Sequence, residues 1–156
     1  MKNCDIYLLD KIAGDSFYLN QLKIFQSDLV FDVNSTYVGY LHMNIRRLTG
    51  VAIVTHLRNN RVRSWNIPVK YRDQDLLSFE EVNALAQQYA TPLGMNVTSR
   101  QRIGDIHYPM FLSYYLNNES NQSDSTGGSI TVDRLDGHIW TAEEMEEYFY
   151  DYNNLI

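Results

Sequence analysis

The chain has 156 residues, 44% of them hydrophobic, and a formal net charge of −6 at pH 7. This length predicts a single domain over residues 1–156 with a core of its own, and the lone cysteine, Cys4, excludes an internal disulfide bond. No apolar run reaches the roughly 18 residues of a membrane span, and Asp5 and Asp10 interrupt the N-terminal apolar run that a signal peptide needs, so we expect a cytoplasmic protein without a membrane partner.

The first half of the chain is predicted to contain a strand, two helices and a hairpin. Residues 4–9 form a short apolar run typical of a strand, and residues 15–29 show helical spacing behind a capping residue. Residues 34–50 place apolar side chains on one helical face, although their β-branched and aromatic content leaves a strand open as the alternative. Residues 51–69 predict two strands around the tight turn at 58–60.

The second half is predicted to contain a helix, a meander of strands and a final helix. Their order is helix 78–91, strands 95–103, 107–116 and 129–134, and helix 142–152. Ser78 and Glu81 form a capping box, and so do Thr141 and Glu144. Residues 117–128 are polar and predict a flexible loop. Because hairpins build antiparallel sheets that helices cover, the fold class is α+β, with a curved antiparallel sheet packed against helices.

Charge is distributed unevenly along the chain. No acidic residue occurs between Asp32 and Asp73, and this interval contains seven basic residues: Arg46, Arg47, Arg58, Arg61, Arg63, Lys70 and Arg72. From Glu119 to the C-terminus there are nine acidic residues and one basic residue, Arg134. A basic interval in an otherwise acidic chain indicates an electrostatic interaction surface.

The predicted basic hairpin within residues 51–69 is the sharpest candidate surface. Side chains alternate along a strand, so Arg61, Arg63 and Trp65 are expected on one face, with Arg58 at the turn. We therefore predict that this surface docks a protein with an acidic surface. The predicted partner-binding residues are Arg58, Arg61, Arg63, Trp65, Lys70 and Arg72.

Two other interpretations of these cations stay open. The first is neutralisation within the molecule by the acidic C-terminal helix, whose carboxylates are Glu143, Glu144, Glu146 and Glu147. The second is a nucleic-acid site, because arginines beside a tryptophan bind phosphates and stack on bases. The net charge of −6 opposes nucleic acid, since long-range repulsion hinders its approach.

The stretch 133–143 raises the question of a calcium-binding loop. With Gly137 at position 6 of an EF-hand loop, Asp136 and Glu143 suit positions 5 and 12. Positions 1 and 3 then fall on Val132 and Arg134, which cannot replace the two carboxylates that a divalent ion requires. The sequence therefore predicts a turn with Asp-Gly at its tip, followed by a helix.

No strong catalytic signature occurs in the sequence. A phosphate-binding loop, a dinucleotide fingerprint and a nucleophile elbow are all absent, and the histidines lack the spacing of helical metal ligands. An Asp–His pair could form from Asp105 or Asp136 with His107 or His138, but such pairs arise by chance among many carboxylates. No metal or cofactor is predicted, and a non-enzymatic role is favoured.

The order of elements resembles known folds. The helix "LSFEEVNALAQQYA" followed by strands resembles the helix-then-meander arrangement of cystatin-like folds, and "ITVDRLDGHIW" is similar to the end of PepSY-type modules. Residues 77–140 carry this resemblance, and residues 15–76 resemble the NTF2-like superfamily as a pattern only. The resemblance implies a curved sheet around helices, often with a cavity. It does not specify a function, because NTF2-like proteins include enzymes, ligand binders and bacterial immunity proteins.

These observations favour a binding protein, of the kind represented by small bacterial or phage inhibitors and immunity proteins. One alternative is a small-ligand binder or an enzyme that uses an NTF2-like cavity. A second is nucleic-acid binding, or a decoy in which the acidic C-terminal segment mimics DNA. A homodimer is compatible with each of them.

Overall fold

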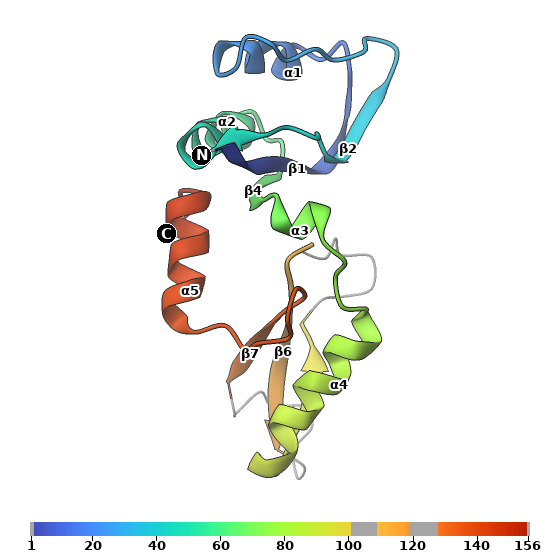
Figure 1. Ribbon diagram of the computed structural model, residues 1–156, viewed down its shortest axis with the longest axis vertical. Helices are drawn as coiled ribbons and strands as arrows, with labels where there is room; N and C mark the ends of the chain where they lie inside the picture. Colours follow the sequence, from blue (N-terminus) through green and yellow to red (C-terminus); the bar gives the residue numbers. More distant parts are fainter. Residues whose placement is uncertain (1, 101–108, 119–127, 156) are drawn as a thin grey trace. The chain divides into compact units, whose positions relative to one another are not determined.

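The computed structural model describes residues 2–100, 109–118 and 128–155. The chain divides into two compact units (Figure 1). Unit 1 comprises residues 1–73 and 143–156, and unit 2 comprises residues 74–142. That both units act together as the one domain expected from the chain length stays a prediction.

The sheet of unit 1 is built around one long central strand, β1 (Lys2–Ala13). Strand β2 (Thr36–Tyr40) pairs with it on one side. Strands β3 (Ile45–Arg46) and β4 (Ser64–Pro68) also pair with β1, and every pairing is antiparallel. β1 contains the predicted strand at residues 4–9, which is therefore confirmed.

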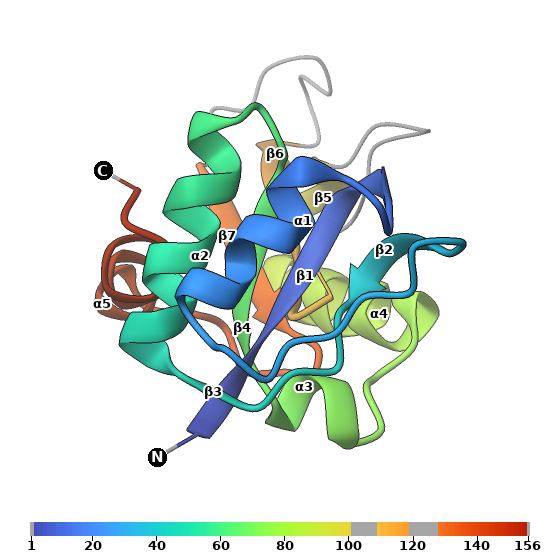
Figure 2. The same ribbon diagram turned by 90° about the horizontal axis from the view of Figure 1, so that it is seen from above.

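Helices pack on this sheet and close the core of unit 1 (Figure 2). The helical elements are α1 (Phe17–Gln21), the 3-10 helix η1 (Leu22–Ile24), α2 (Arg47–Asn59), α3 (Lys70–Asp73), α5 (Ala142–Glu146) and the π-helix η3 (Glu147–Tyr152). The core joins Ile6 and Leu8 of β1 to Ile53, Val54 and Leu57 of α2, all fully buried. Burial of side chains of this kind is worth about 1.5–3 kcal/mol each.

Two of the predicted elements in unit 1 are wrong. Residues 34–50 form strands β2 and β3 and only the start of α2, so the strand alternative holds for most of this segment. Residues 51–59, predicted as a strand, belong to α2, and the predicted basic hairpin is a helix followed by a strand. The buried positions Gly50, Ile53, Val54 and Leu57 follow helical spacing, which outweighs the β-branched content.

Gly50 is required at its position on α2. A Cβ atom there would collide with the side chain of Asn66 on β4, so the absence of a side chain lets helix and strand approach closely. Asn66 is fully buried and donates from Nδ2 to the backbone carbonyl oxygens of Arg47 and Tyr152. Packing against a distant strand thus selects the helix.

Unit 2 contains a three-stranded antiparallel sheet and one long helix. Its elements are α4 (Phe79–Ala90), the 3-10 helix η2 (Thr91–Leu93) and strands β5 (Met95–Ser99), β6 (Phe111–Asn118) and β7 (Ser129–Asp133), in sheet order β5-β6-β7. α4 packs Val82 and Ala86 against Leu112 and Tyr114 of β6. The Ser78 hydroxyl accepts a hydrogen bond from the Glu81 amide, as the capping box predicts.

Most of the helices and strands predicted for the second half of the chain are confirmed. The helix at 78–91 and the strands that become β5, β6 and β7 are present, and the final helix runs from α5 into η3. Of the predicted loop at 117–128, Asn117 and Asn118 belong to β6, and residues 119–127 lie outside the described residues. Residues 101–108, which overlap two predicted strands, lie outside as well. The α+β class is confirmed.

Candidate functional site

The six predicted partner-binding residues do not form one hairpin surface. Arg58 lies in the last turn of α2, while Arg61 occupies the following turn with a positive φ of 63°. Arg63 precedes β4, and Trp65 lies within β4. Because β4 begins at Ser64, Arg61 and Arg63 lie before the strand, and the alternation expected for Arg61, Arg63 and Trp65 does not hold.

Trp65 belongs to the interior. It is only 8% exposed, and its ring stacks on Tyr148 at 6.0 Å between centroids and meets Phe149 edge-on at 5.8 Å. Both contacts come from the π-helix η3, so Trp65 attaches the C-terminal segment to β4. A side chain used in this way contributes to stability and offers no surface to a partner.

Three of the predicted arginines bond within the molecule. Arg58 donates from Nη2 to the carbonyl oxygen of Asn153 at 2.7 Å, and burial lowers its pKa. Arg63 forms a fork on Asp10, with Nη2 at 2.8 Å from Oδ1, and this pairing lowers the pKa of Asp10. Arg72 is held most firmly of the three, with its side chain 12% exposed.

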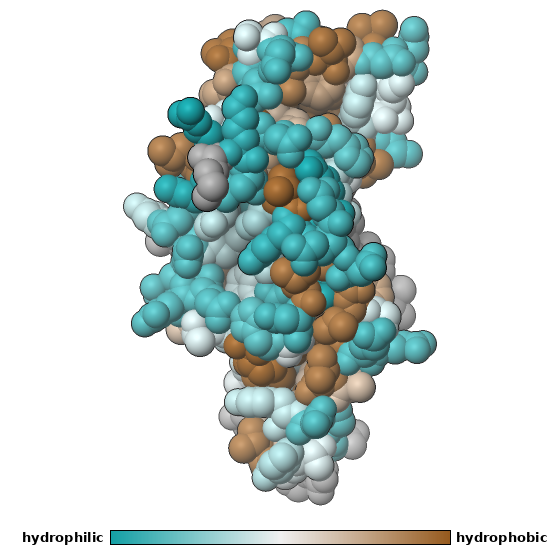
Figure 3. All heavy atoms as spheres, viewed as in Figure 1, coloured by the Kyte–Doolittle hydropathy of each residue, from teal (hydrophilic) through white to brown (hydrophobic). Residues whose placement is uncertain are grey.

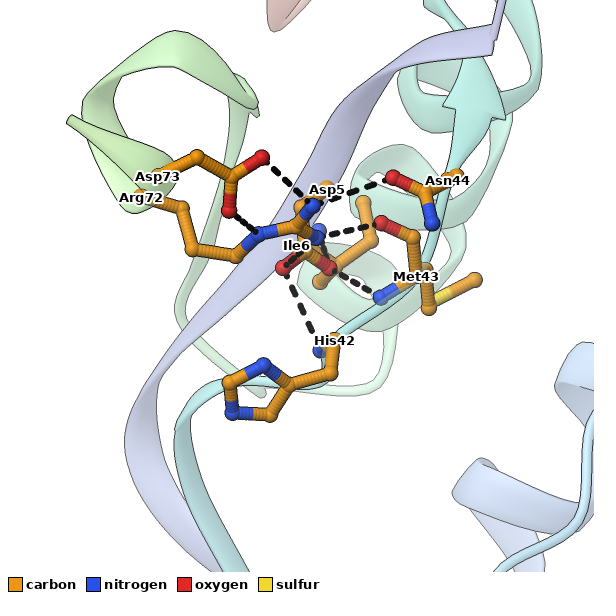
Figure 4. A network of polar contacts seen from close by, with 7 residues as sticks. All are labelled: Asp5, Ile6, His42, Met43, Asn44, Arg72 and Asp73. Carbon is orange, nitrogen blue, oxygen red and sulfur yellow. Dashed lines mark hydrogen bonds and ion pairs between the residues drawn. The ribbon is translucent and has the colours of Figure 1, made fainter.

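Arg72 is the centre of a polar network that joins three parts of unit 1 (Figure 4). Its Nη1 lies 3.0 Å from Oδ2 of Asp5 and donates to the Met43 carbonyl oxygen at 2.7 Å. Its Nε lies 2.7 Å from Oδ1 of Asp73, and Nη2 donates to the Asn44 side chain. The bonds to Asp73, followed by those to Asp5, raise the pKa of Arg72.

Asp5 completes the network from β1. It is fully buried and accepts the backbone N–H groups of Ile6, His42 and Met43 in addition to Arg72. His42 has a positive φ of 60°, which turns its own amide and that of Met43 toward the same carboxylate. The predicted site residue Arg72 thus ties α3 and the loop at 41–44 to β1, and we assign it a structural role.

Arg61 and Lys70 are exposed, and neither forms an ion pair with the described residues. Lys70 begins α3, next to Val69, whose amide donates to the Asn3 carbonyl oxygen at 2.8 Å. Lys70 therefore lies close to the start of β1, at an edge of unit 1 that carries further basic residues. Figure 2 shows the N-terminus, β3 and α3 along this one edge of unit 1.

The further cations at this edge are Lys2, Arg46 and Arg47. Lys2 and Arg46 are opposite each other in the antiparallel pairing of β1 with β3, and both are exposed. Arg46 is also the N-cap of α2, and Arg47 is its first helical residue. We call Lys2, Arg46, Arg47 and Lys70 the cationic end of unit 1.

The start of α2 lacks the residues that usually stabilise a helix N-terminus. Its N-cap side chain makes no capping hydrogen bond, and its first turn has no acidic residue. Helix N-termini favour negative charge, so cations here cost about 0.3–1 kcal/mol each. Like charges directly opposite each other in a sheet also repel. The helix start and the pairing of Lys2 with Arg46 are therefore each electrostatically unfavourable for the cations involved.

A hollow of about 470 Å³ opens beside the start of α2. It is lined by Asn3, Arg46, Arg47, Leu48, Thr49 and Tyr152. Arg47 donates from Nη1 to the Asp151 carbonyl oxygen and lies over the Tyr152 ring at 5.9 Å. Burial raises the pKa of Tyr152, and the neighbouring carboxylates Glu147 and Asp151 act in the same direction. Leu48 is 68% exposed at the rim, so the site combines cations with an apolar contact.

Three potential metal ligands lie together in unit 2. Ligand atoms of Asp133, Asp136 and His138 are all within 4.8 Å of one another. Asp133 already accepts hydrogen bonds from the Leu135 amide and from Nε1 of Trp140, both at 2.7 Å. Asp136 accepts from the amide and ring of His138, which follows it in the turn. The hydrogen bonds of the predicted turn thus explain this grouping, and we assign no metal to it.

Sequence reasoning included Arg46 and Arg47 in the basic interval, near the end of the segment predicted as a helix or a strand, and it missed Lys2. The pairing of Lys2 with Arg46 joins residues far apart in the chain, so no local pattern reveals it. The local signal that could have identified this site is a pair of arginines at the start of a helix whose first turn has no acidic residue.

Comparison with protein-family models, with curated proteins and with solved structures gives no match to this chain. The likeness to cystatin-like and NTF2-like folds therefore stays a prediction. Among the residues that the structure describes, no helix combines the length and the apolar character needed to cross a bilayer.

Proposed function

We propose that this protein acts by binding a partner protein with an acidic surface, and that the cationic end of unit 1 is the docking site. The observation that supports this most directly is the placement of Lys2 opposite Arg46 at the N-terminus of α2. Carboxylates of a partner would relieve both the repulsion between these cations and their conflict with the helix dipole.

The surface also has the composition of a docking site. Arginine is enriched where proteins bind each other, and Leu48 adds an exposed apolar side chain among the cations. The described residues of the cationic end come from β1, β3, α2 and α3, so a rigid scaffold holds the charges. The proposal keeps the function class of a small inhibitor or immunity-type protein and moves its contact surface away from Arg58, Arg63, Trp65 and Arg72.

The test compares two double charge reversals with equal change in net charge. Lys2→Glu with Arg46→Glu alters the cationic end, and Lys11→Glu with Lys23→Glu alters two other exposed lysines of unit 1. Each variant is used to capture proteins from host lysate treated with nuclease, with quantitative mass spectrometry. We expect one acidic protein to be retained by wild type and control but lost by the first variant.

The retained protein is then purified and its binding measured at increasing ionic strength. Affinity is expected to fall with salt and to fall by at least about tenfold in the Lys2→Glu, Arg46→Glu variant, since charge pairs at interfaces are typically worth more than about 1.4 kcal/mol. Equal binding by both double variants would refute the proposed site. Loss of all capture on nuclease treatment would instead identify a nucleic acid and refute a protein partner.

A further inference from the structure

A second hollow in unit 1 lies between the segment that precedes β2 and the segment that follows it. Its volume is about 450 Å³, which is within the range of small-molecule sites. It is lined by residues from 26–31 and 41–44, by Tyr37 of β2 and by Lys2 of β1. Figure 2 shows the two segments next to each other. All of these lining residues are described and belong to unit 1, so the hollow is formed within that unit.

The walls of this hollow are held in place by contacts behind them. Phe31 and Tyr37 meet edge to face, with ring centroids 5.3 Å apart. The Tyr37 hydroxyl accepts a hydrogen bond from the Asp32 amide at 2.7 Å. Residues 41–44 are tied to the buried Asp5, which accepts two of their backbone N–H groups. Walls that are fixed before binding reduce the entropy lost when a ligand enters.

The deeper part of the hollow is apolar. Phe31 and Met43 are 9% and 4% exposed, and Leu29 and Leu41 are half-buried beside them. Figure 3 shows apolar surface, interspersed with hydrophilic side chains, at the end of unit 1 that holds α1. The hollow therefore offers apolar contact to the body of a ligand and polar groups to its ends.

The polar side chains around the hollow have bonding capacity that the described residues do not use. Within the described ranges, no hydrogen bond or ion pair engages the side chains of Lys2, Asp28 and His42. The Tyr37 hydroxyl accepts a hydrogen bond and keeps its own proton to donate. Asn44 accepts from Arg72 through Oδ1, which leaves its Nδ2 as a donor. An ammonium, a carboxylate and two neutral donors thus line one small hollow.

The backbone of His42 is strained at the hollow. Its φ of 60° is uncommon for a residue other than glycine, and such conformations are concentrated at binding and active sites. The amide of His42 donates to Asp5, whereas its ring points away from that carboxylate in Figure 4 and lines the hollow. The same strained residue therefore completes the network around Asp5 and presents an imidazole at the hollow.

We infer that this hollow binds a small zwitterion with an apolar body, the chemical class of the apolar amino acids and dipeptides. The Lys2 ammonium pairs with the carboxylate of the ligand, and the Asp28 carboxylate pairs with its ammonium group. The apolar part packs on Phe31 and its neighbours. A ligand with only one of the two charges would bring the other charged side chain next to it without a counter-charge. The inference goes beyond the proposed function, and only Lys2 belongs to both surfaces.

The first test uses the wild-type protein and three ligands. Isotope-labelled protein is titrated with the dipeptide leucyl-phenylalanine up to about 10 mM, followed by amide NMR shifts. We expect saturable shift changes at residues 28–31 and 41–44 and at the side-chain amide of Asn44. The N-acetylated dipeptide lacks the ammonium group, and the dipeptide amide lacks the carboxylate. Each is expected to bind at least about tenfold more weakly, because each loses a charge-assisted hydrogen bond.

The second test assigns each charge to its side chain. Lys2→Met should weaken binding of the dipeptide by about tenfold but should not weaken binding of the dipeptide amide, which has no carboxylate to lose. Asp28→Asn should have the same effect on the dipeptide and none on its N-acetylated form. The matched controls are Lys11→Met, in the same strand as Lys2, and Asp15→Asn. Both residues are exposed outside the hollow and should bind like wild type.

The inference is overturned if wild type shows no saturable shift changes at the hollow, or if both analogues bind as well as the dipeptide. It is also overturned if Lys2→Met and Asp28→Asn bind the dipeptide like their controls, with amide spectra that show folded proteins. Asp28 lies outside the cationic end, so Asp28→Asn should still capture the acidic partner. Failure of dipeptide binding and failure of partner capture are therefore separate results.

Discussion

Arg72 shows how a residue chosen for binding from its charge can serve the fold. Its guanidinium is the only side-chain cation that the described residues place against the fully buried Asp5. We expect Arg72→Met to lower the free energy of unfolding by about 3 kcal/mol, because it leaves a buried carboxylate without its counter-charge. The value lies at the low end of the usual range, since Asp5 keeps three backbone N–H donors. Urea denaturation followed by circular dichroism measures this change.

The matched control applies the same substitution at an exposed arginine. Arg61→Met lies in the turn after α2 and is expected to change stability by less than about 0.5 kcal/mol. If Arg72→Met proves as mild as Arg61→Met, the network around Asp5 does not stabilise unit 1. Arg72 would then be available to a partner after all.

At the scale of elements, the side chain of Asn153 is one of the contacts through which the C-terminal segment stabilises β4. Asn153→Ala removes the acceptor of the buried Asn66 amide and is expected to cost about 1–3 kcal/mol, the penalty of an unsatisfied buried donor. Hydrogen exchange should show faster exchange of the Asn66 amide. Asn59→Ala, at the exposed end of α2, serves as the control and should leave both stability and this amide unchanged. Unaltered exchange at Asn66 in Asn153→Ala would contradict the role assigned to Asn153.

The elements also show what could be predicted from sequence. The helix at 79–90 was predictable because its cap, spacing and stop are all local: the Ser78 hydroxyl accepts from the Glu81 amide, and Pro92 lies two residues beyond Ala90, the last residue of α4. α2 was missed because Gly50 and several β-branched residues argue locally against a helix. The contact of Gly50 with Asn66, which favours the helix, joins distant parts of the chain.

The candidate site, like the secondary structure, could be predicted only in part from the sequence. The basic interval correctly indicated where cations are concentrated, and Lys70 remains in the proposed surface. Strand alternation wrongly predicted that Trp65 belongs to a binding surface. Its burial against Tyr148 depends on a segment at the other end of the chain. The pairing of Lys2 with Arg46 depends on strand register, which distant contacts set. The sequence therefore predicted where basic residues are concentrated, but it did not predict which side chains are exposed.

For the whole molecule, the ionisable groups define a pH window of stability. Hydrogen bonds from Arg63 lower the pKa of Asp10, and hydrogen bonds from Arg72 lower that of Asp73, both below 3.8. Folding therefore favours the deprotonated carboxylates, and their contribution to stability, present at neutral pH, is lost as pH falls through these lowered pKa values.

At the alkaline limit, burial raises the pKa of the Cys4 thiol from 9.0 to about 11. Folding favours the protonated thiol, so this contribution is present below pH 9 and lost as pH rises toward 11.

We therefore expect the melting temperature to be highest near neutral pH and to fall at both limits. Two variants separate the causes in thermal melts. Asp10→Asn should flatten the acid limb, because its carboxylate no longer takes up a proton on unfolding, and Cys4→Ala should flatten the alkaline limb, because the buried thiol no longer loses one. Cys4→Ala will be less stable overall through its cavity, so the comparison concerns the slope with pH and not the absolute temperature. A wild-type melting temperature that is equal at pH 3 and pH 7 would contradict the pairing of Asp10 and Asp73 with their arginines, and an unchanged alkaline slope in Cys4→Ala would contradict the burial of the thiol.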